Sequence, residues 1–316
     1  MVGLKAANRG LGDKDESFSD PSTFWLPREM FRIKLGSLVS ILFNGECNGV
    51  GRINFIPYGL QAIREILPEG DGPFTELALS SDFSPTSSVN ALPTLIQNAT
   101  ILQCVLSNLA LERDDPLINL GGDCGSELVP IAWLNERLNG QLQVVWFDAH
   151  ADLNLPRTSP GGGFHGMVLR TLCGEGPVDL EPFVPRPLHP SQITLAGVRD
   201  LDNEEVRYIA CRALRQLPVQ AINESPDAVA NVLDPDIPVY LHVDYDVLDG
   251  DSYPQSTYPS PHGLSVHSLS RALACVRNTR RVAGMSLTEY APQPAQRDTP
   301  ILRQLLTEGF GIPMKF

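Results

Sequence analysis

The chain has 316 residues, of which 42% are hydrophobic, and its formal net charge at neutral pH is −13. This length is ample for the core of one large α/β domain or two small ones. The acidic balance argues against a nucleic-acid partner and favours cationic ligands. The sequence has no apolar run of about 18 residues, so we expect no membrane span.

The cysteines indicate a reducing compartment. All six are scattered along the chain without CxxC spacing: Cys47, Cys104, Cys124, Cys173, Cys211 and Cys275. Such a pattern is typical of reduced intracellular thiols rather than of a disulfide framework. The first residues also lack the basic segment and apolar run of a secretory signal. We therefore expect a cytoplasmic protein.

The predicted elements alternate between strands and helices. Residues 1–36 are polar and predict an irregular N-terminal extension, and residues 37–316 predict a single domain. The strands predicted from apolar runs are 37–43, 117–120, 143–147, 192–197, 238–243 and 281–287, and the helices predicted from apolar spacing are 57–67, 93–111, 126–138, 203–214, 265–277 and 299–308. A proline-rich stretch at 177–190 predicts a stiff surface loop. The alternation predicts a three-layer α/β/α fold with a mainly parallel central sheet.

Two of the predicted strands end in residue types that bind metals. The runs are VVWFDAHAD at 144–152 and VYLHVDYD at 239–246. Buried charges are unfavourable unless they are paired or bind a metal, and ligands of open α/β sheets bind beyond the carboxyl ends of the strands. Two such ends side by side would gather four carboxylates and an imidazole, from Asp148, His150, Asp152, Asp244 and Asp246.

Two cations would relieve the repulsion within this group. Carboxylates with one imidazole suit Mn²⁺, and two metals about 3.5–4 Å apart can activate a bridging water. The alternative is that the aspartates are ordinary turn and helix-cap residues. Two such runs, each directly after a strand, favour the metal site.

The chain resembles the arginase/agmatinase (ureohydrolase) family over roughly residues 38–309. The resemblance rests on the order and spacing of many motifs: GGDC at 121–124, DAHADLN at 148–154, HG at 165–166, GVRDLD at 197–202, DYDVLD at 244–249, GLS at 263–265, and Glu289. It implies an arginase-like catalytic domain at 37–316, two Mn²⁺ per chain, and hydrolysis of a guanidino C–N bond to give urea.

The resemblance also implies a role for each metal ligand. Asp148 and Asp244 would bridge both ions, Cys124 and Asp152 would complete the shell of the first, and His150 and Asp246 would complete the second.

The resemblance further implies that three side chains serve the reaction itself. Asp152 would also accept a hydrogen bond from the attacking hydroxide, His165 would deliver a proton to the leaving amine, and Glu289 would anchor the guanidinium group.

Cys124 departs from the family pattern, which has histidine as the first ligand. Thiolate is soft, whereas Mn²⁺ prefers hard donors. Cys124 is therefore either a metal-bound thiolate or a buried, inert cysteine. A cysteine at this position also occurs in atypical arginase relatives, some of which act on Nω-hydroxyarginine. The cysteine therefore affects the prediction of which metal binds more than the prediction of the reaction class.

The residues expected to bind the α-amino and α-carboxylate groups of the substrate match the family pattern only in part. Asp202 and Glu205 resemble the family's pattern for an α-ammonium group, or they form a helix N-cap. Asn154 and Ser159 match two of three α-carboxylate contacts, but the third position is Gly161, which has no hydroxyl. Tyr258 stands where a smaller threonine is common.

This pattern favours an arginine residue of a peptide as the substrate, converted to ornithine plus urea. The alternatives are free L-arginine or Nω-hydroxy-L-arginine. Outside that class, a non-catalytic metal-binding scaffold and a deacetylase with one Zn²⁺ are the rivals. His165 and Glu289 disfavour the scaffold, and the two aspartate motifs disfavour the deacetylase. The oligomeric state is left open.

Overall fold

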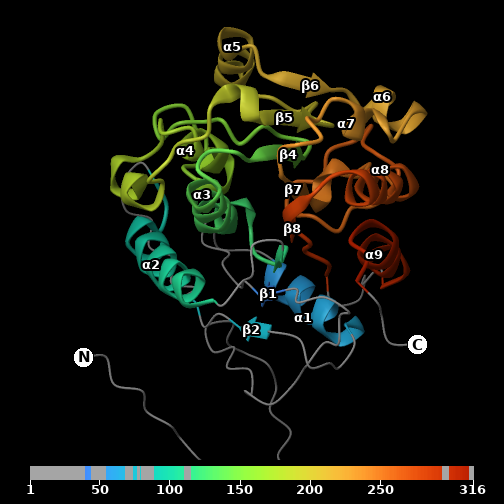
Figure 1. Ribbon diagram of the computed structural model, residues 1–316, viewed down its shortest axis with the longest axis horizontal. Coiled ribbons are helices and arrows are strands. Elements are labelled where there is room, and N and C mark those ends of the chain that lie inside the picture. The colour runs from blue at the N-terminus through green and yellow to red at the C-terminus, as the bar shows by residue number, and fades with distance from the viewer. Residues whose placement is uncertain are drawn as a thin grey trace, which may run out of the picture.

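The computed structural model describes residues 40–43, 55–67, 74–76, 79, 89–109, 115–293 and 299–312. The predicted extension at 1–36 lies outside the described residues. The described strands form one eight-stranded sheet in the order β2-β1-β3-β8-β7-β4-β5-β6 (Figure 1). Every pair of neighbouring strands is parallel. The strands are β1 (Ser40–Phe43), β2 (Phe74–Glu76), β3 (Leu117–Leu120), β4 (Gln143–Phe147), β5 (Ile193–Ala196), β6 (Arg215–Leu217), β7 (Val239–Asp244) and β8 (Val282–Thr288).

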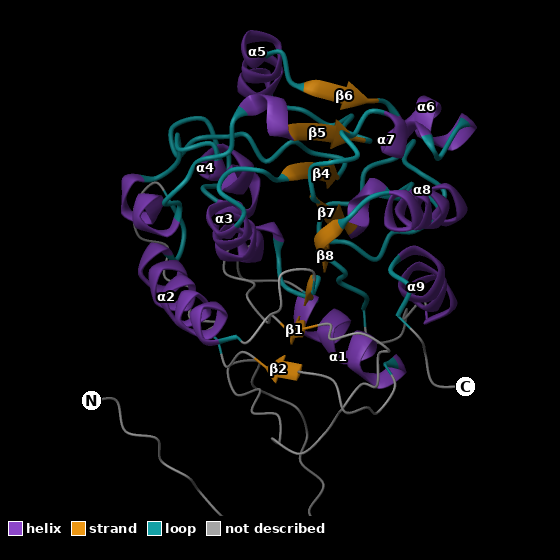
Figure 2. Cartoon of the chain, in the orientation of Figure 1, coloured by secondary structure: helices purple, strands orange, loops and turns teal. Residues whose placement is uncertain are grey.

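Helices cover both faces of the sheet. One layer contains α2 (Leu92–Asn108), α3 (Leu128–Arg137), α4 (Val168–Leu172) and α5 (Asn203–Arg212). The other contains α1 (Ile56–Ile66), α6 (Val219–Glu224), α7 (Ala228–Asn231), α8 (Val266–Thr279) and α9 (Thr299–Gln304). Figure 2 shows the two groups on opposite sides of the strands. The predicted three-layer α/β/α fold is therefore confirmed.

Alternation along the central strands divides the core between the two layers. In β4, Val144 and Trp146 pack in the layer that contains α2 and α3. Val145 and Phe147 point to the opposite face and pack in the layer that contains α1 and α8. This period of two is the ordinary geometry of a strand. Because both faces are covered, the central strands are mainly apolar, as expected of a parallel sheet, with buried polar exceptions such as Asn119, His242 and Ser286.

Two glycines make the turn after β3. Gly121 and Gly122 have φ of 87° and 86°, a region that side chains with a Cβ rarely occupy. The turn leads into the 3₁₀ helix η1 (Cys124–Glu127), which is capped by Asp123 through a 2.8 Å hydrogen bond from the Gly125 backbone N–H. Cys124 is thereby held at the carboxyl edge of the sheet.

Several elements differ from the sequence-based expectations. Strands β2 and β6 and the short helices α4, α6 and α7 were not predicted. Helix α3 starts at Leu128, after η1, and the last predicted helix is divided between α9 and the π-helix η6 (Leu305–Gly309). The proline-rich stretch contains the 3₁₀ helices η3 (Val178–Phe183) and η4 (Pro190–Gln192). None of these differences changes the architecture.

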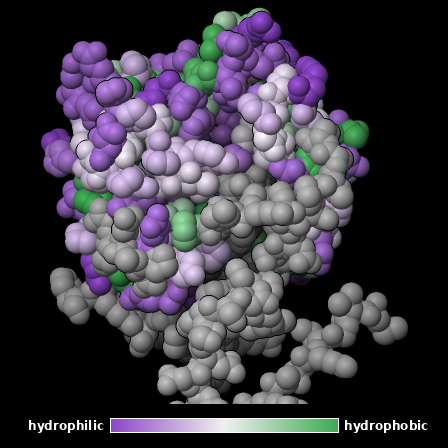
Figure 3. Space-filling view, turned by 180° about the vertical axis from the view of Figure 1, so that it is seen from behind, coloured by the Kyte–Doolittle hydropathy of each residue, from purple (hydrophilic) through white to green (hydrophobic). Residues whose placement is uncertain are grey.

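The surface has few large apolar side chains. Among the described residues, those exposed are Val178, Val206 and Tyr258. Figure 3 shows one face as mainly hydrophilic where it is coloured, with hydrophobic surface in small separate areas. No helix in the described part of the chain is long and apolar enough to cross a membrane.

Candidate active site and metal centre

Neighbouring strands bring the predicted metal ligands to one edge of the sheet. Cys124 follows β3, Glu289 follows β8, Asp244 ends β7 and Asp148 follows β4. Potential ligand atoms lie within 4.8 Å of one another in three overlapping groups: Cys124, Asp148, Asp152 and His242; Cys124, Asp244 and Glu289; and Asp148, His150 and Asp246. All six predicted metal ligands therefore lie in one cluster.

Hydrogen bonds orient the carboxylates before any metal binds. Asp148 accepts from the His150 backbone N–H at 2.6 Å and from the Trp146 indole at 3.0 Å. Asp244 accepts from the Asp246 backbone N–H at 2.7 Å. Asp246 in turn accepts from the Ala149 backbone N–H at 3.1 Å, which joins the two motifs across β4 and β7. The cluster is thus preorganised by its own backbone.

Burial and mutual repulsion oppose ionisation of these carboxyls. The side chains of Asp148, Asp152 and Asp244 are almost completely buried. Burial raises the pKa of each, and charged neighbours raise it further: Asp246 acts on Asp148 and Asp244, and Asp148 acts on Asp152. Such a group gains free energy when a cation compensates its charge.

His150 supplies part of that compensation. Its Nδ1 is 3.1 Å from Asp246 Oδ2 and 3.4 Å from Asp148 Oδ1. Burial opposes a charge on the ring, but Asp246 and Asp148 raise the pKa of His150 above its ordinary value. The imidazolium in turn lowers the pKa of Asp246 against the effect of burial. A cation bound through Nδ1 would replace this proton, as metal binding to imidazole requires.

Two carboxylate oxygens of the cluster lack a hydrogen-bond partner among the described residues, one on Asp152 and the other Glu289 Oε2. The Asp152 oxygen, Oδ2, is buried. Asp152 also has a φ of 53°, in the left-handed region. Strained backbone of this kind is found at functional sites. An orphan oxygen among buried carboxylates fits a divalent cation, so the residues present suit the predicted metal centre.

Cys124 lies inside the cluster rather than beside it. Its side chain is 2% exposed, and its Sγ is 2.9 Å from Asp244 Oδ2. Burial and the nearby Asp244 raise the pKa of the thiol, so without a cation it stays protonated. A bound metal would reverse this preference, because a coordinating thiol loses its proton.

A cavity of about 250 Å³ opens above the ligands. His165, in the 3₁₀ helix η2 (Phe164–Met167), lines it and stacks on Tyr258 with ring centroids 5.3 Å apart and an interplanar angle of 16°. Glu289 lines it from the end of β8, with a φ of 58°. Burial and the charge of Asp123 raise the pKa of Glu289. A buried carboxyl in this setting suits a cationic guanidinium group.

The predicted substrate contacts line the same cavity: Asn154, Ser159, Asp202 and Glu205. The Asn154 side chain donates to Asp202 Oδ2 at 2.7 Å, and Ser159 Oγ accepts from the Gly162 backbone N–H at 3.0 Å. Asp202 and Glu205 also form a capping box at the start of α5. The helix-cap role and a position in the cavity wall are therefore compatible.

The prediction assigned no role to three residues that shape the site. His242 is fully buried on β7, and its ring stacks on Trp146 with centroids 3.6 Å apart. Since His242 and Asp244 are two residues apart in a strand, they share a face, and this was the signal available in the sequence. The stacking of Tyr258 on His165 had no such signal, because they lie on separate loops.

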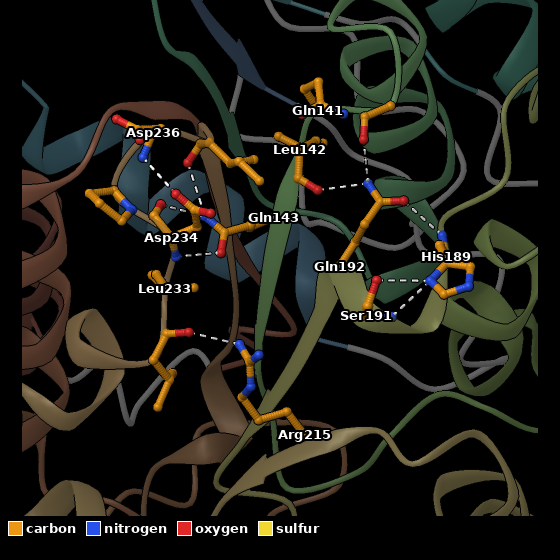
Figure 4. A pocket seen from close by; sticks show the side chains of 14 residues that line it. Gln141, Leu142, Gln143, His189, Ser191, Gln192, Arg215, Leu233, Asp234 and Asp236 are labelled. Carbon is orange, nitrogen blue, oxygen red and sulfur yellow. Dashed lines mark hydrogen bonds between the residues drawn. The ribbon is translucent and has the colours of Figure 1, made fainter.

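A larger cavity, of about 680 Å³, opens at the opposite edge of the sheet. Figure 4 shows that its polar side chains bond to one another and to nearby backbone. Gln192 donates to the Leu142 carbonyl at 2.7 Å, Gln143 to the Asp234 carbonyl at 2.9 Å and Arg215 to the Val232 carbonyl at 2.8 Å. These groups hold loops together at the amino ends of the strands, away from the edge where ligands of such sheets bind.

The fold and the cluster define a three-layer α/β protein with a carboxylate-rich cation site at the carboxyl edge of its sheet. The sequence matches the Arginase family over residues 79–308, more than half of the chain. The chain belongs to the Arginase family.

Individual relatives are distant. The arginase of Staphylococcus aureus (strain COL) is 32% identical over 186 residues, which cover 56% of this chain and 60% of the relative. The crystal structure of Entamoeba histolytica arginase in complex with L-ornithine superposes with a TM-score of 0.76, at 21% identity, over 89% of this chain and all of that chain. Proclavaminate amidino hydrolase of Streptomyces clavuligerus has a TM-score of 0.63, at 20% identity, over 93% and 97% of the two chains. The last two likenesses establish the fold alone.

Proposed function

We propose that this protein is an amidinohydrolase that uses two divalent cations, most suitably Mn²⁺, to hydrolyse the guanidino group of arginine. The products are an ornithine unit and urea. The observation that carries the proposal is the joint placement of the buried ligand cluster, His165 and Glu289 in one cavity. A scaffold that only binds metal needs neither of the last two residues.

Each of three side chains has a separate role in the proposed reaction. When bound, the cations would lower the pKa of water and polarise the substrate. Glu289 holds the guanidinium group by charge-assisted hydrogen bonds. The carboxylate of Asp152 accepts a hydrogen bond from the attacking water. His165 delivers a proton to the leaving nitrogen as the C–N bond breaks.

We propose an arginine residue within a peptide as the substrate. Gly161 supports this choice, because it lines the cavity and a Cβ built on it would meet no atom within 4 Å. The open space beside Gly161 leaves room for the peptide chain of the substrate to continue beyond its arginine. Gly161 also has no hydroxyl group that would favour a substrate with a free carboxylate. At the α-amino end of the arginine, Asp202 and Glu205 can accept hydrogen bonds from a peptide N–H.

Free L-arginine, or Nω-hydroxy-L-arginine, is the second candidate. Asp202 is exposed at the cavity rim and bonded to Asn154, so an α-ammonium group could bind there directly. The free thiols of the described cysteines support a cytoplasmic location for either reaction.

The test compares three substrates with the Mn²⁺-loaded protein: a peptide with an internal arginine, free L-arginine and Nω-hydroxy-L-arginine. We expect the peptide to be converted at least as well as free arginine. Conversion removes a mass of about 42 Da from the peptide and releases one urea. Turnover of the free amino acids without this mass loss in any peptide would reject the peptide substrate but keep the amidinohydrolase.

Gly161→Ser is the matched variant for this comparison. Its backbone does not require glycine and its surroundings are open, so the variant should fold. The new hydroxyl should bind a free carboxylate and improve kcat/KM for free arginine about tenfold relative to the peptide. An unchanged ratio would mean that this position does not face the α-carboxylate.

A further inference from the structure

His242 is the only histidine on β7, and it lies inside the ligand cluster. It is fully buried, and its Nε2 is 3.6 Å from Cys124 Sγ and 4.0 Å from Asp148 Oδ2. These atoms and an oxygen of Asp152 all lie within 4.8 Å of one another. The four donors are close enough together to bind one ion, next to the pair that His150 forms with Asp246.

The spacing between sulfur and nitrogen suits a common metal ion. Bonds of about 2.3 Å to sulfur and about 2.0–2.1 Å to nitrogen, at a tetrahedral angle, separate the two donors by about 3.6 Å. Cys124 Sγ and His242 Nε2 have this separation. The orphan Oδ2 of Asp152 supplies a further donor that no described group engages.

The other ring nitrogen of His242 has the surroundings of a metal-bound histidine. Such a histidine usually donates its second N–H to a carboxylate, a carbonyl or another polar group that fixes the tautomer. Nδ1 of His242 is 3.2 Å from Ser286 Oγ and 3.6 Å from the buried carboxylate of Glu127. Asn119 donates to Glu127 in turn. Nε2 is then left to face Cys124.

The ring is also fixed in orientation. Trp146 stacks on it at 3.6 Å between centroids, with an interplanar angle of 22°, and the Trp146 indole donates to Asp148. One aromatic side chain thus positions both an imidazole and a carboxylate of the same group. This second layer of contacts would be unnecessary for a histidine that only fills space.

We infer that His242 is a metal ligand, and that its Nε2, together with Cys124 Sγ, Asp148 and Asp152, binds the first cation of the proposed centre. The inference rests on the proposed function for the presence of that centre. An imidazole from within β7 thereby makes up for the one that Cys124 replaces. This donor set suits Co²⁺, Zn²⁺ or Cd²⁺ better than Mn²⁺, so Mn²⁺ at this position should be the more easily exchanged of the two ions.

The test uses ¹¹³Cd²⁺ as a probe of the whole protein with ¹⁵N-labelled histidine. We expect scalar coupling between ¹¹³Cd and two imidazoles, those of His150 and His242, with coupling of one cadmium also to the β-protons of Cys124. Coupling to His150 but not to His242 would overturn the inference, and would make His242 a packing residue. Because this experiment involves no turnover, it is independent of whether urea is released.

Variants assign the signals and measure the effect. His242→Asn should weaken one of the two Cd²⁺ sites by more than about 100-fold, whereas Ser286→Ala, which removes the contact to Nδ1 and leaves Nε2 in place, should cost about 10–100-fold or less. His267→Asn removes an exposed histidine of α8 and should leave both affinities unchanged. Equal affinities in His242→Asn and the unaltered protein would contradict the proposed ligand. If His242→Asn does not fold, the coupling in the unaltered protein decides alone.

Discussion

His165 combines a half-buried position with an aromatic partner. It lines the cavity and stacks on Tyr258, and it belongs to none of the ligand groups of the described chain. We predict that His165→Ala keeps both cations and lowers turnover by about 10²–10⁴-fold, the usual contribution of a positioned acid or base. Elemental analysis and urea release measured on the same sample check this prediction. A fully active variant would place the proton donor elsewhere.

Asp152 illustrates the conflict between stability and function at a single residue. Burial and the charge of Asp148 raise its pKa above the ordinary value of 3.8. Because the folded state holds this proton more tightly than the unfolded state does, protonated Asp152 stabilises the fold fully at pH values below its ordinary pKa. This stabilisation is lost as the pH rises through the raised pKa of the folded state. In the metal-free protein, ionised Asp152 should destabilise the fold increasingly at higher pH.

Asp152→Asn should therefore be more stable than the unaltered protein in the presence of a chelator. Asparagine tolerates the left-handed φ of 53° at this position. We expect the difference in the free energy of unfolding between the variant and the unaltered protein to widen from about pH 5 to about pH 8, where it reaches about 1–3 kcal/mol. Measurements of Tm for both proteins across this pH range check the prediction. A difference that narrows with rising pH would show that Asp152 is compensated by a neighbour in the metal-free protein. The same variant should lose metal and activity.

At the scale of residues, most of the cluster could be predicted from the sequence, because its ligands lie in two short motifs at strand ends. The resemblance predicted that His165 and Glu289 lie in the same cavity as these metal ligands. His242 was overlooked because a histidine in an apolar strand is more often a core residue. Cys124 is 118 residues away from His242 in the sequence and shares no local motif with it, so only the fold shows that the two side chains face each other.

At the scale of elements, α5 is tied to the loop after β4. Glu205 accepts hydrogen bonds from the Leu153 backbone N–H at 3.0 Å and from the Asp202 backbone N–H at 2.9 Å. Its side chain is 3% exposed, so loss of the carboxylate would leave two donors without partners. The cap therefore positions the wall of the cavity as well as the helix.

We predict that Glu205→Ala lowers the free energy of unfolding by about 1–3 kcal/mol. Glu204→Ala is the matched control one residue earlier, where the only described ion pair is a 4.0 Å contact with the exposed Arg207. Its effect should be within about 0.5 kcal/mol. Denaturant unfolding of both variants checks the difference. Equal effects of the two changes would mean that Glu205 acts only through helix propensity.

Long elements were easier to predict than short ones. The central strands are mainly apolar runs, and α8 shows a helical period and a serine cap at Ser265. The edge strand β6 has only three residues, Arg215–Leu217, of which two are exposed, so no apolar pattern marks it. Its pairing with β5 comes from the tertiary fold. The π-helix η6 likewise continues a helical pattern without a local signal.

At the scale of the whole molecule, the parallel sheet explains where the chemistry lies. All described strands run in the same direction, so their carboxyl ends share one edge, and the ligands come from neighbouring strands there. The alternation of strands and helices predicted this architecture and the resemblance predicted the family. The choice of a peptide arginine over free arginine stays a prediction, because it depends on loop positions such as Gly161 and on how far the cavity opens.

Under the proposed function, the ligand cluster holds two cations that activate water for hydrolysis of the guanidino group. The most direct measurement titrates the metal-free protein with Mn²⁺ and follows bound metal and urea release from arginine substrates together. We predict that activity rises to a plateau at two ions per chain, and that Asp246→Asn loses both binding and activity. One tightly bound Zn²⁺ with no gain from Mn²⁺, or a full metal complement without urea from any of the three substrates, would contradict the account.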